Sequence, residues 1–482
     1  MFNIKFETPP KELYTMRCLF FIFLAAISLS ACQQPTPPSP AVQPPKMILS
    51  ERPEMPDWAK NAVLYELNTR QFSSNGDFNG VTLQLPRLKE LGVDIIWLMP
   101  IHPIGKEKRK GSLGSPYSVV DFKAINPDFG TEDDLRRLIQ KAHEIGLKVI
   151  LDWVPNHTAW DAVWKNQHPT YYTKYNGDFT VPINEHGEPI ADWSDICDLD
   201  YAQPATRAAM IDAMQYWIKK CDIDGFRCDM AGLVPNDFWK EVRPALDTLK
   251  PMFMLSEWQD EPAHFNSCFH ANYGWKFKDI TKDIWKGKQD AQSLDTLRDF
   301  LNDFYPKDYC QLYFTQNHDE NSWTGTESEL YGISSDVMNV LAWTWQGMPM
   351  IYCGQEDNQG RRLKFFDRDP IRWKKYSRSL FFQRLNALKH DNQAVWNGKF
   401  GGDLVKFSTT DDKNIYAYGR EKNGDKVIVI ANLNKFSKTV TITPSSKFSG
   451  AYANVFGSNT MQVTGEMQMT LKPWEYLVLT NK

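Results

Sequence analysis

The sequence lacks several features that mark whole classes of protein. Its 8 cysteines include no pair with the C-x-x-C spacing of a metal or redox motif. Basic residues are not in excess, since 55 Lys and Arg stand against 59 Asp and Glu, for a net charge of −4. Nucleic acid is therefore not an expected partner. The 9 histidines do not cluster as a metal-dependent barrel hydrolase would require.

The composition predicts a large, well-packed globular chain. Hydrophobic residues make up 42% of the 482 positions and charged residues 24%, which excludes global disorder. This length suits a barrel with an appended domain better than one ordinary domain. Aromatic residues are frequent, with 17 Trp and 19 Tyr. We expect most of them in the core and a few in contact with a sugar, because the CH-rich faces of sugars bind aromatic rings.

The first 56 residues are predicted to be an export signal and a tether. The apolar run at residues 19–29 is too short to span a membrane, and it ends in Leu29-Ser30-Ala31-Cys32. This site resembles a bacterial lipoprotein signal, so residues 1–32 form the signal region and Cys32 is the expected lipidation site. An ordinary signal peptide is the alternative. Residues 33–56 are Pro-rich and form an extended tether. The prediction is an exported lipoprotein, anchored in a membrane at its periplasmic face or at the cell surface.

Apolar runs alternate with amphipathic stretches along most of the remaining chain. The expected strands are residues 63–68, 94–99, 148–154, 225–229, 253–257, 268–273, 312–316 and 350–354. The expected helices include residues 82–91, 131–145, 203–221 and 334–345. Eight strands alternating with helices predict an α/β fold of the (β/α)8 TIM barrel type.

Two segments depart from this alternation. Residues 158–204 have no clear helical period and are too many for an ordinary loop, so they are predicted to form an inserted subdomain after the third strand. Residues 396–482 alternate as strands at 404–408, 415–420, 426–432, 439–443 and 476–480, which predicts an antiparallel β-sandwich. The barrel then comprises residues 57–157 and 205–395.

Four short segments carry ionisable residues where expected barrel strands end. They read LDWVPNH at 151–157, GFRCD at 225–229, LSEW at 255–258 and TQNHD at 315–319. A strand that is apolar up to its C-terminal end and ionisable there is typical of a barrel strand facing the reaction. The sequence therefore predicts one cleft that receives the carboxylates of Asp229, Glu257 and Asp319.

These four segments resemble the four signature regions of the α-amylase family, glycoside hydrolase family 13. The resemblance extends to Asp198-Leu199-Asp200 in the expected insertion and to Ser115-Pro116-Tyr117 after the second strand. It also includes PMIYCGQE at 349–356, at the expected eighth strand. It covers nearly the whole chain from residue 57 onward, and an ordered set of strand-end motifs is highly specific.

The resemblance implies a catalytic role for each carboxylate. Retaining glycosidases need one carboxylate as nucleophile and a second carboxyl as acid and then base. Asp229 is implied to be the nucleophile and Glu257 the acid/base. Asp319 is implied to hold sugar hydroxyls and favour the distorted transition state. The implied substrate-binding residues are Tyr117, His157, Arg227, Trp258, Asn317 and His318. Arg227 lies on the same strand face as Asp229 and is expected to orient it, with Asp152 as its structural partner.

The resemblance also raises the question of a calcium ion. It implies Asn156 and Asp198 as ligands, and oxygen ligands suit calcium. A second candidate is the polar segment at residues 73–79, for which the alternative is a simple polar turn. No organic cofactor is expected.

Three functional interpretations remain open on the sequence. The leading one is a hydrolase that cleaves α-1,4 bonds in starch, maltodextrins or maltooligosaccharides with retention. A second is a maltooligosaccharide-trimming enzyme or glucosyltransferase of the same family, because hydrolysis and transfer share the glycosyl-enzyme intermediate. A third is a non-catalytic glucan-binding protein, since a fold can persist without its chemistry. Residues 230–233 are Met-Ala-Gly-Leu, whereas many α-amylases carry Lys-His there. This difference affects the contacts with sugars on the acceptor side of the cleaved bond, and so the specificity.

Overall fold

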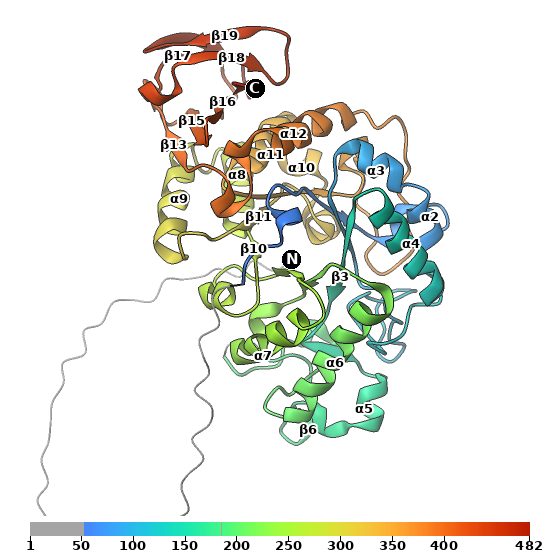
Figure 1. Cartoon of the computed structure of the whole chain (residues 1–482). Helices are drawn as coiled ribbons and strands as arrows, with labels where there is room; N and C mark the ends of the chain where they lie inside the picture. Colours follow the sequence, from blue (N-terminus) through green and yellow to red (C-terminus); the bar gives the residue numbers. More distant parts are fainter. Residues whose placement is uncertain (1–52, 185) are drawn as a thin grey trace, which may run out of the picture. The chain divides into compact units, whose positions relative to one another are not determined.

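The computed structural model describes residues 53–184 and 186–482 (Figure 1). The predicted signal region, Cys32 and all but the end of the predicted tether lie outside the described residues. Within the described part, none of the helices is long and apolar enough to cross a membrane.

A closed parallel barrel forms the centre of the structure. Its strands are β1 (Leu64–Leu67), β2 (Ile95–Leu98), β3 (Lys148–Trp153), β8 (Gly225–Cys228), β9 (Phe253–Ser256), β10 (Ala271–Tyr273), β11 (Gln311–Tyr313) and β12 (Gly347–Tyr352). They close in the order β1-β12-β11-β10-β9-β8-β3-β2. Each overlaps one of the eight expected strands, and the TIM-barrel prediction is confirmed. Strands covered on both faces need apolar residues at nearly every position, which is why short continuous apolar runs identified them.

Helices surround the barrel and bury its outer face. They are α1 (Thr69–Phe72), α2 (Phe78–Thr82), α3 (Leu85–Leu91), α4 (Glu132–Glu144), α6 (Pro204–Cys221), α7 (Asn236–Asp247), α8 (Trp275–Trp285), α9 (Gln292–Phe304), α10 (Glu327–Tyr331), α11 (Ser335–Thr344) and α12 (Ser379–Asp391). Helix α4 begins with a capping box between Thr131 and Asp134, which satisfies its first free N–H groups.

The chain between β3 and α6 forms a small irregular layer at the C-terminal end of β3. It contains α5 (Val163–Gln167) and the short strands β4 (His157–Ala159), β5 (Lys174–Tyr175), β6 (Asp178–Phe179) and β7 (Ile196–Asp198). Strands β4 and β7 pair antiparallel, so that His157 lies opposite Asp198. Because it begins only a few residues after β3, this layer lies on the side of the barrel where the strand ends carry polar residues.

Two antiparallel sheets follow the barrel. One has six strands, β13 (Leu404–Lys406), β15 (Ile415–Lys422), β16 (Asp425–Asn432), β21 (Tyr476–Thr480), β18 (Gly450–Asn454) and β19 (Thr460–Val463), in that order. The other has three, β14 (Ser408–Thr409), β17 (Lys438–Thr443) and β20 (Met467–Leu471). A shared apolar core includes Ile428, Ile442 and Leu479. The turn Asn423-Gly424 joins β15 to β16, and both residues have positive φ.

The sequence prediction missed β18, β19 and β20. These strands lie within residues 450–471, where Gln, Thr, Asn and Met alternate with few aliphatic residues. Each buries only one or two side chains. Half-covered strands of this kind give a weak hydrophobic signal, since pairing with neighbours holds them in place.

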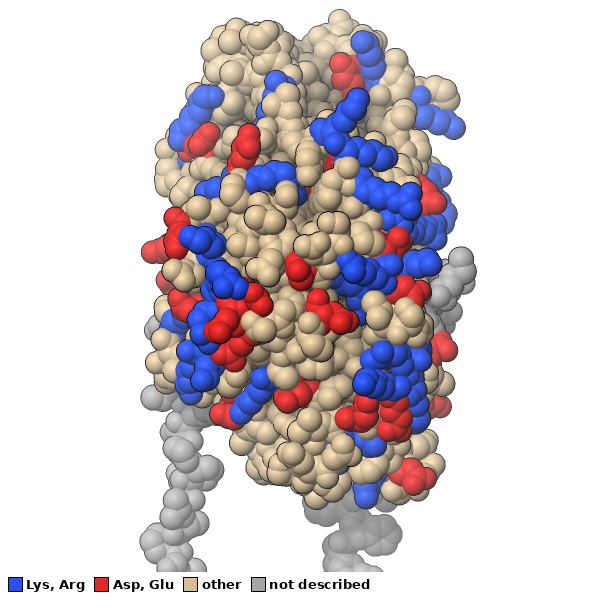
Figure 2. Space-filling model, turned by 90° about the vertical axis from the view of Figure 1, so that its right-hand side faces the viewer, with Lys and Arg blue, Asp and Glu red and all other residues tan. Residues whose placement is uncertain are grey.

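Charged side chains of both signs are mixed over the face of the molecule seen in Figure 2. Lysines and arginines lie beside aspartates and glutamates over most of it. A mixed surface produces no strong field of one sign to steer a charged polymer.

Candidate active site

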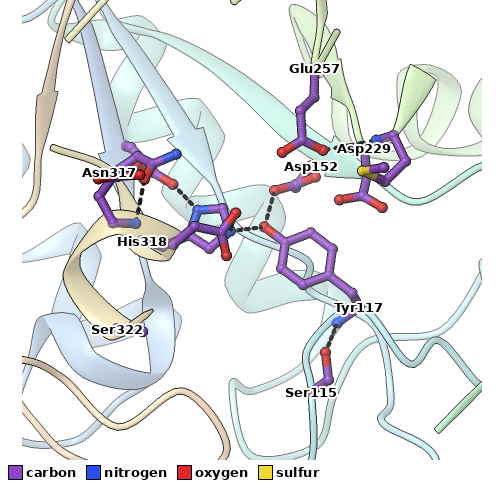
Figure 3. Close-up of polar contacts among 12 residues, drawn as sticks. Ser115, Tyr117, Asp152, Asp229, Glu257, Asn317, His318 and Ser322 are labelled. Atoms are coloured by element: carbon purple, nitrogen blue, oxygen red, sulfur yellow. Dashed lines mark hydrogen bonds and ion pairs between the residues drawn. The ribbon is translucent and has the colours of Figure 1, made fainter. Parts of the chain in front are cut away.

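One buried arginine connects three carboxylates at the barrel strand ends, Asp152, Asp229 and Glu257, which are labelled in Figure 3. Arg227, on β8, is fully buried and donates through Nη1 to Asp152 Oδ1 at 2.8 Å and to Asp229 Oδ1 at 3.0 Å. Its Nη2 forms an ion pair with Glu257 Oε1 at 2.7 Å. Asp229 directly follows β8 and Glu257 directly follows β9, so two neighbouring strands deliver the pair. The expected partnership of Asp152 with Arg227 is confirmed.

The surroundings of Asp229 favour proton uptake. Burial and the neighbouring Glu257 carboxylate raise the pKa of Asp229 well above its usual range, against the opposing charge of Arg227. Two buried carboxylates on one guanidinium therefore hold a proton more readily than two isolated carboxylates. A pair that supplies one proton donor and one nucleophile needs this property.

Four side chains of the site, Glu66, His318, Tyr117 and Asp152, form a directed hydrogen-bond chain. His318 Nδ1 bonds Glu66, its Nε2 lies 2.9 Å from the Tyr117 hydroxyl, and that hydroxyl donates to Asp152 Oδ2 at 3.0 Å. The charges of Asp319 and Glu66 outweigh burial and raise the pKa of His318 to about 9. A protonated imidazole donates from both nitrogens, so the chain runs from His318 to Glu66 on one side and through Tyr117 to Asp152 on the other.

The third predicted catalytic carboxylate lies nearer the solvent. The Asp319 side chain is 38% exposed and its Oδ2 lies 3.5 Å from His318 Nε2. It immediately precedes a π-helical turn, Glu320–Thr324, and such turns are frequent at functional sites. An accessible carboxylate beside a cationic imidazole is suited to accepting hydrogen bonds from a ligand's hydroxyl groups.

His157 and Asn317 are both buried but differ in their hydrogen-bond partners. Burial lowers the pKa of His157 to about 3, and its Nε2 has no hydrogen-bond partner among the described residues. A neutral imidazole with a spare nitrogen fits its predicted role in ligand binding. Asn317, in contrast, is fully buried and accepts from the Glu320 backbone N–H at 2.8 Å. Asn317 therefore holds the turn that follows Asp319, its Nδ2 has no partner among the described residues, and its contact with a ligand stays a prediction.

The segment after Asp229 packs against Trp258, the residue that directly follows Glu257. Met230 has φ of 43°, and its backbone N–H donates to Glu257 Oε2 at 2.8 Å. A Cβ atom at Gly232 would lie 2.1 Å from Trp258 Cδ2, so only glycine leaves room for the indole. Trp258 is half-buried against this segment. Its ring thus combines packing against Gly232 with partial exposure, and it directly follows Glu257 in the chain.

The two predicted calcium ligands lie close together but form an incomplete site. Leu199 donates its backbone N–H to the Asn156 carbonyl, which brings Asp198 and Asn156 together. The described residues contain no group of three or more His, Cys, Asp or Glu side chains able to hold a metal ion. Calcium takes six to eight oxygen ligands, usually with several carboxylates. These residues do not fit that need, and calcium binding stays a prediction.

The second calcium candidate, residues 73–79, forms a polar turn and a helix cap. Asp77 caps α2 by accepting from the Gly80 N–H at 2.7 Å, and Ser73 Oγ accepts from Gly76 N–H at 3.0 Å. Asn79 donates to Asp134 at 3.4 Å. These contacts are those of a polar turn and helix cap.

Three buried residues of the site were missed in the sequence. Glu66 on β1 supports His318, Tyr273 on β10 accepts from Arg227 Nε at 3.2 Å, and Trp97 on β2 donates to Asp152 at 3.1 Å. Glu66 carried a usable signal, since it is an ionisable residue near the end of an apolar strand. Tyr273 and Trp97 carried none, because a buried aromatic residue in a strand is ordinary core.

Comparison with known families identifies both parts of the chain. The family described as "Alpha amylase, catalytic domain" matches residues 59–196 and 190–379. The family described as "Maltogenic Amylase, C-terminal domain" matches residues 405–478. The first match covers the barrel and the layer between β3 and α6, and the second covers the two antiparallel sheets.

Curated relatives and solved structures agree with these matches. The chain is 27% identical to α-amylase MalA of Haloarcula japonica over 86% of its own length, and it spans 63% of that relative. It is 26% identical to α-amylase 3 of Dictyoglomus thermophilum, with 79% and 86% of the two chains covered. Among solved structures, a noncanonic maltogenic α-amylase from Thermotoga neapolitana is similar with a TM-score of 0.78 and 27% identity, covering 88% of this chain and 99% of that one.

Proposed function

The chain belongs to the α-amylase family of glycoside hydrolases, and on that premise we propose that it hydrolyses α-1,4-glucosidic bonds in starch, maltodextrins or maltooligosaccharides with retention of configuration. The observation that carries this proposal is the shared contact of Arg227 with Asp229 and Glu257. A binding protein has no need of two carboxylates held on one guanidinium, whereas a retaining glycosidase requires a close pair.

In the first step, Asp229 attacks the anomeric carbon and Glu257 gives its proton to the glycosidic oxygen. The bond from carbon to that oxygen breaks, the shortened sugar leaves as an alcohol, and an ester joins the remaining sugar to Asp229. Arg227 orients the Asp229 carboxylate through its 3.0 Å hydrogen bond. Tyr117 lies beneath the reacting ring, and Asp319 and His157 accept or donate hydrogen bonds at its hydroxyls.

In the second step, Glu257 takes a proton from water as the water oxygen bonds to the anomeric carbon. The ester bond to Asp229 breaks, the sugar is released with its original configuration, and Glu257 regains its proton. Arg227 again faces an ionised Asp229. If a second sugar hydroxyl replaces water in this step, the same residues perform transfer.

The product profile tests this function. Wild type and Asp229→Asn are incubated with maltoheptaose labelled at its reducing end and with soluble starch. Mixed oligosaccharides from internal cuts, lost in Asp229→Asn, are the expected result. Glucose or maltose released from one end would indicate a trimming enzyme, and products longer than the substrate would indicate a glucosyltransferase. Absence of turnover by wild type would reject the proposal.

Replacing Glu257 by Gln separates an enzyme from a binding protein. We expect turnover to fall by about 10³-fold or more, because the leaving oxygen loses its proton donor, while maltoheptaose binding persists. A variant with wild-type turnover would contradict the role of Glu257.

We further propose that the protein is exported and anchored in a membrane through lipidated Cys32, with the catalytic part at the periplasmic face or the cell surface. The support is the sequence Leu29-Ser30-Ala31-Cys32 after a short apolar run. Membrane fractionation of wild type and Cys32→Ala tests this. Wild type is expected in the membrane fraction and Cys32→Ala outside it, and equal membrane association would contradict lipidation at Cys32.

A further inference from the structure

We propose that Trp323, together with Phe365 and Phe366, is a sugar-binding platform for glucose units on the non-reducing side of the cleaved bond. This inference rests on the proposed function and extends it to substrate length. The three residues lie outside the four signature segments and outside the hydrogen-bond chain of the site.

The aromatic side chains form a continuous series that begins in the active site. Tyr117 stacks on His318, with 5.4 Å between ring centroids and 21° between planes. Phe365 lies parallel to Tyr117 at 6.2 Å and 8°. Trp323 then contacts Phe365 at 5.2 Å and Phe366 at 5.6 Å. Apolar ring faces in series match a chain of sugars, each of which offers a CH-rich face.

Exposure increases along this series toward the solvent. Tyr117 is 8% exposed, Phe365 and Phe366 are half-buried, and Trp323 is 52% exposed. A large aromatic ring left in water loses the benefit of burial, which a bound ligand restores. A single exposed ring such as that of Trp323 is common on protein surfaces and by itself indicates no binding site. Here it continues an aromatic series that starts at His318 and Tyr117 in the active site.

Hydrogen bonds hold Trp323 and the phenylalanines in fixed relative positions. Trp323 belongs to the π-helical turn directly after Asp319. Asn321 Oδ1 accepts from Leu363 N–H at 2.8 Å, and Ser322 Oγ donates to the Leu363 carbonyl at 3.2 Å. The segment that follows Leu363 is itself attached to α1, because Gln71 donates to the Lys364 carbonyl at 2.9 Å. A preformed platform avoids the entropic cost of ordering side chains on binding.

The base of the turn is fixed by a buried ion pair. Lys278 Nζ lies 2.7 Å from Glu320 Oε1, and both side chains are at least nine-tenths buried. The same turn therefore sets the positions of Asp319 and Trp323, which are four residues apart. One rigid element thus presents the carboxylate for the reacting sugar and the ring for its neighbour.

The location of the platform identifies the side of the substrate. Glu257 protonates the leaving oxygen, so the reducing-end fragment departs on the Glu257 side. Trp323 contacts Phe365, and the Phe365 ring lies parallel to that of His318 at 6.2 Å. In Figure 3, Ser322, the residue before Trp323, is seen on the His318 side of the site, opposite Glu257 and Asp229. Sugars that reach Trp323 therefore extend from the reacting ring away from the leaving group, toward the non-reducing end.

The test uses 4-nitrophenyl α-glycosides with one to four glucose units, in which the leaving group is constant and only the non-reducing side grows. Release of 4-nitrophenol gives kcat/KM for wild type, Trp323→Ala and Trp323→Phe. We expect Trp323→Ala to lose about tenfold in kcat/KM on the longer glycosides and little on the glucoside, as loss of one stacking contact predicts. Trp323→Phe should retain most of the activity. Phe436→Ala, at a ring 62% exposed between β16 and β17, is the matched control.

Binding gives an independent readout. Titration of maltoheptaose into Glu257→Gln, with and without Trp323→Ala, should show about tenfold weaker binding in the double variant. Equal losses on all glycosides, or unchanged binding, would overturn the platform while leaving the hydrolase assignment intact. Wild type that releases no nitrophenol would reject the proposed hydrolysis, and the binding comparison would still decide the role of Trp323.

Discussion

The chemistry of this site depends first on how one buried cation is neutralised. Arg227 is fully buried, and an isolated buried charge is strongly unfavourable. Asp152, Asp229 and Glu257 surround it, so removal of any one carboxylate changes the charge balance of the other two. This coupling makes stability and activity respond to the same residues, and often in opposite directions.

Asp229→Asn should stabilise the protein by an amount that grows with pH. The folded protein raises the pKa of Asp229 above the unfolded value of 3.8, so folding takes up a proton that the coupled pair of Asp229 and Glu257 shares. Above pH 3.8, wild type loses stability at up to about 1.4 kcal/mol per pH unit until the folded-state pKa is passed. The variant lacks this loss. Urea unfolding of both proteins at pH 5 and pH 7 checks the prediction, and a difference independent of pH would contradict it.

Glu66→Gln should lower the pKa of His318 from its wild-type value of about 9. The carboxylate of Glu66 stabilises the imidazolium, and a neutral amide does not. Because the wild-type folded pKa lies above the ordinary 6.5, the stabilisation from this pair is complete below pH 6.5 and is lost as the pH rises through 9. In the variant, the loss should still begin near pH 6.5 but should be smaller and be complete at a lower pH.

Imidazole NMR titration measures this shift directly, with His318→Asn used to assign the signal. His157 is the internal control, because burial holds its pKa near 3 and no contact joins it to Glu66 among those of the described residues. An unchanged His318 titration would show that Glu66 does not support the imidazolium.

At the scale of elements, short segments after the strands place the side chains that determine how substrate is held. The segment after β8 is the clearest case. Its Met230 N–H contacts Glu257, and two residues later Gly232 accommodates Trp258. This close packing replaces the Lys-His that many family members carry near this position.

Gly232→Val should displace Trp258 and slow catalysis. A side chain at Gly232 would overlap the indole, and Trp258 adjoins Glu257 in the chain. Misplacing a catalytic group by about 1 Å costs on the order of 10²-fold in rate, so we expect kcat on maltoheptaose to fall by about 10- to 100-fold. Gly465→Val is the matched control, because a Cβ there meets nothing within 4 Å. Equal kcat values for the two variants would argue against the packing role of Gly232.

At the scale of the whole molecule, a second buried arginine attaches the antiparallel sheets to the barrel. Arg420 on β15 donates to the carbonyls of Gly402, Thr344, Trp345 and Trp396, and it is fully buried. Thr344 ends α11, so this side chain joins a barrel helix to the C-terminal sheets. The barrel and sheets are therefore expected to unfold together.

Arg420→Met should destabilise this whole unit. Four carbonyl groups, most of them buried, would lose the hydrogen bond from Arg420, and we expect the free energy of unfolding to drop by about 3 kcal/mol or more. Urea unfolding followed by far-UV circular dichroism should show one transition at a lower midpoint. The control is Lys435→Met, at an exposed position, with an expected change within about 0.5 kcal/mol. Two separate transitions in Arg420→Met would show that the arginine also couples the two parts.

The barrel and its three principal carboxylates were predictable from the sequence because their signals are local. An apolar run that ends in Asp or Glu appears within a few consecutive residues, and parallel strands necessarily bring such ends together. The same logic identified Arg227 and its partner Asp152. The strands within residues 450–471 gave too little apolar signal to be found.

Other features of the site required the folded chain, because they depend on contacts between distant residues. Glu66 and His318 are 252 positions apart, and no local pattern links them. The burial of Asn317 and the space that Gly232 leaves for Trp258 follow from packing alone. In the sequence Trp323 is one aromatic residue among many, and only the folded chain places Phe365 in contact with both Trp323 and Tyr117. Hydrophobic periodicity specifies which strands form, whereas side-chain neighbours are determined only when the barrel closes.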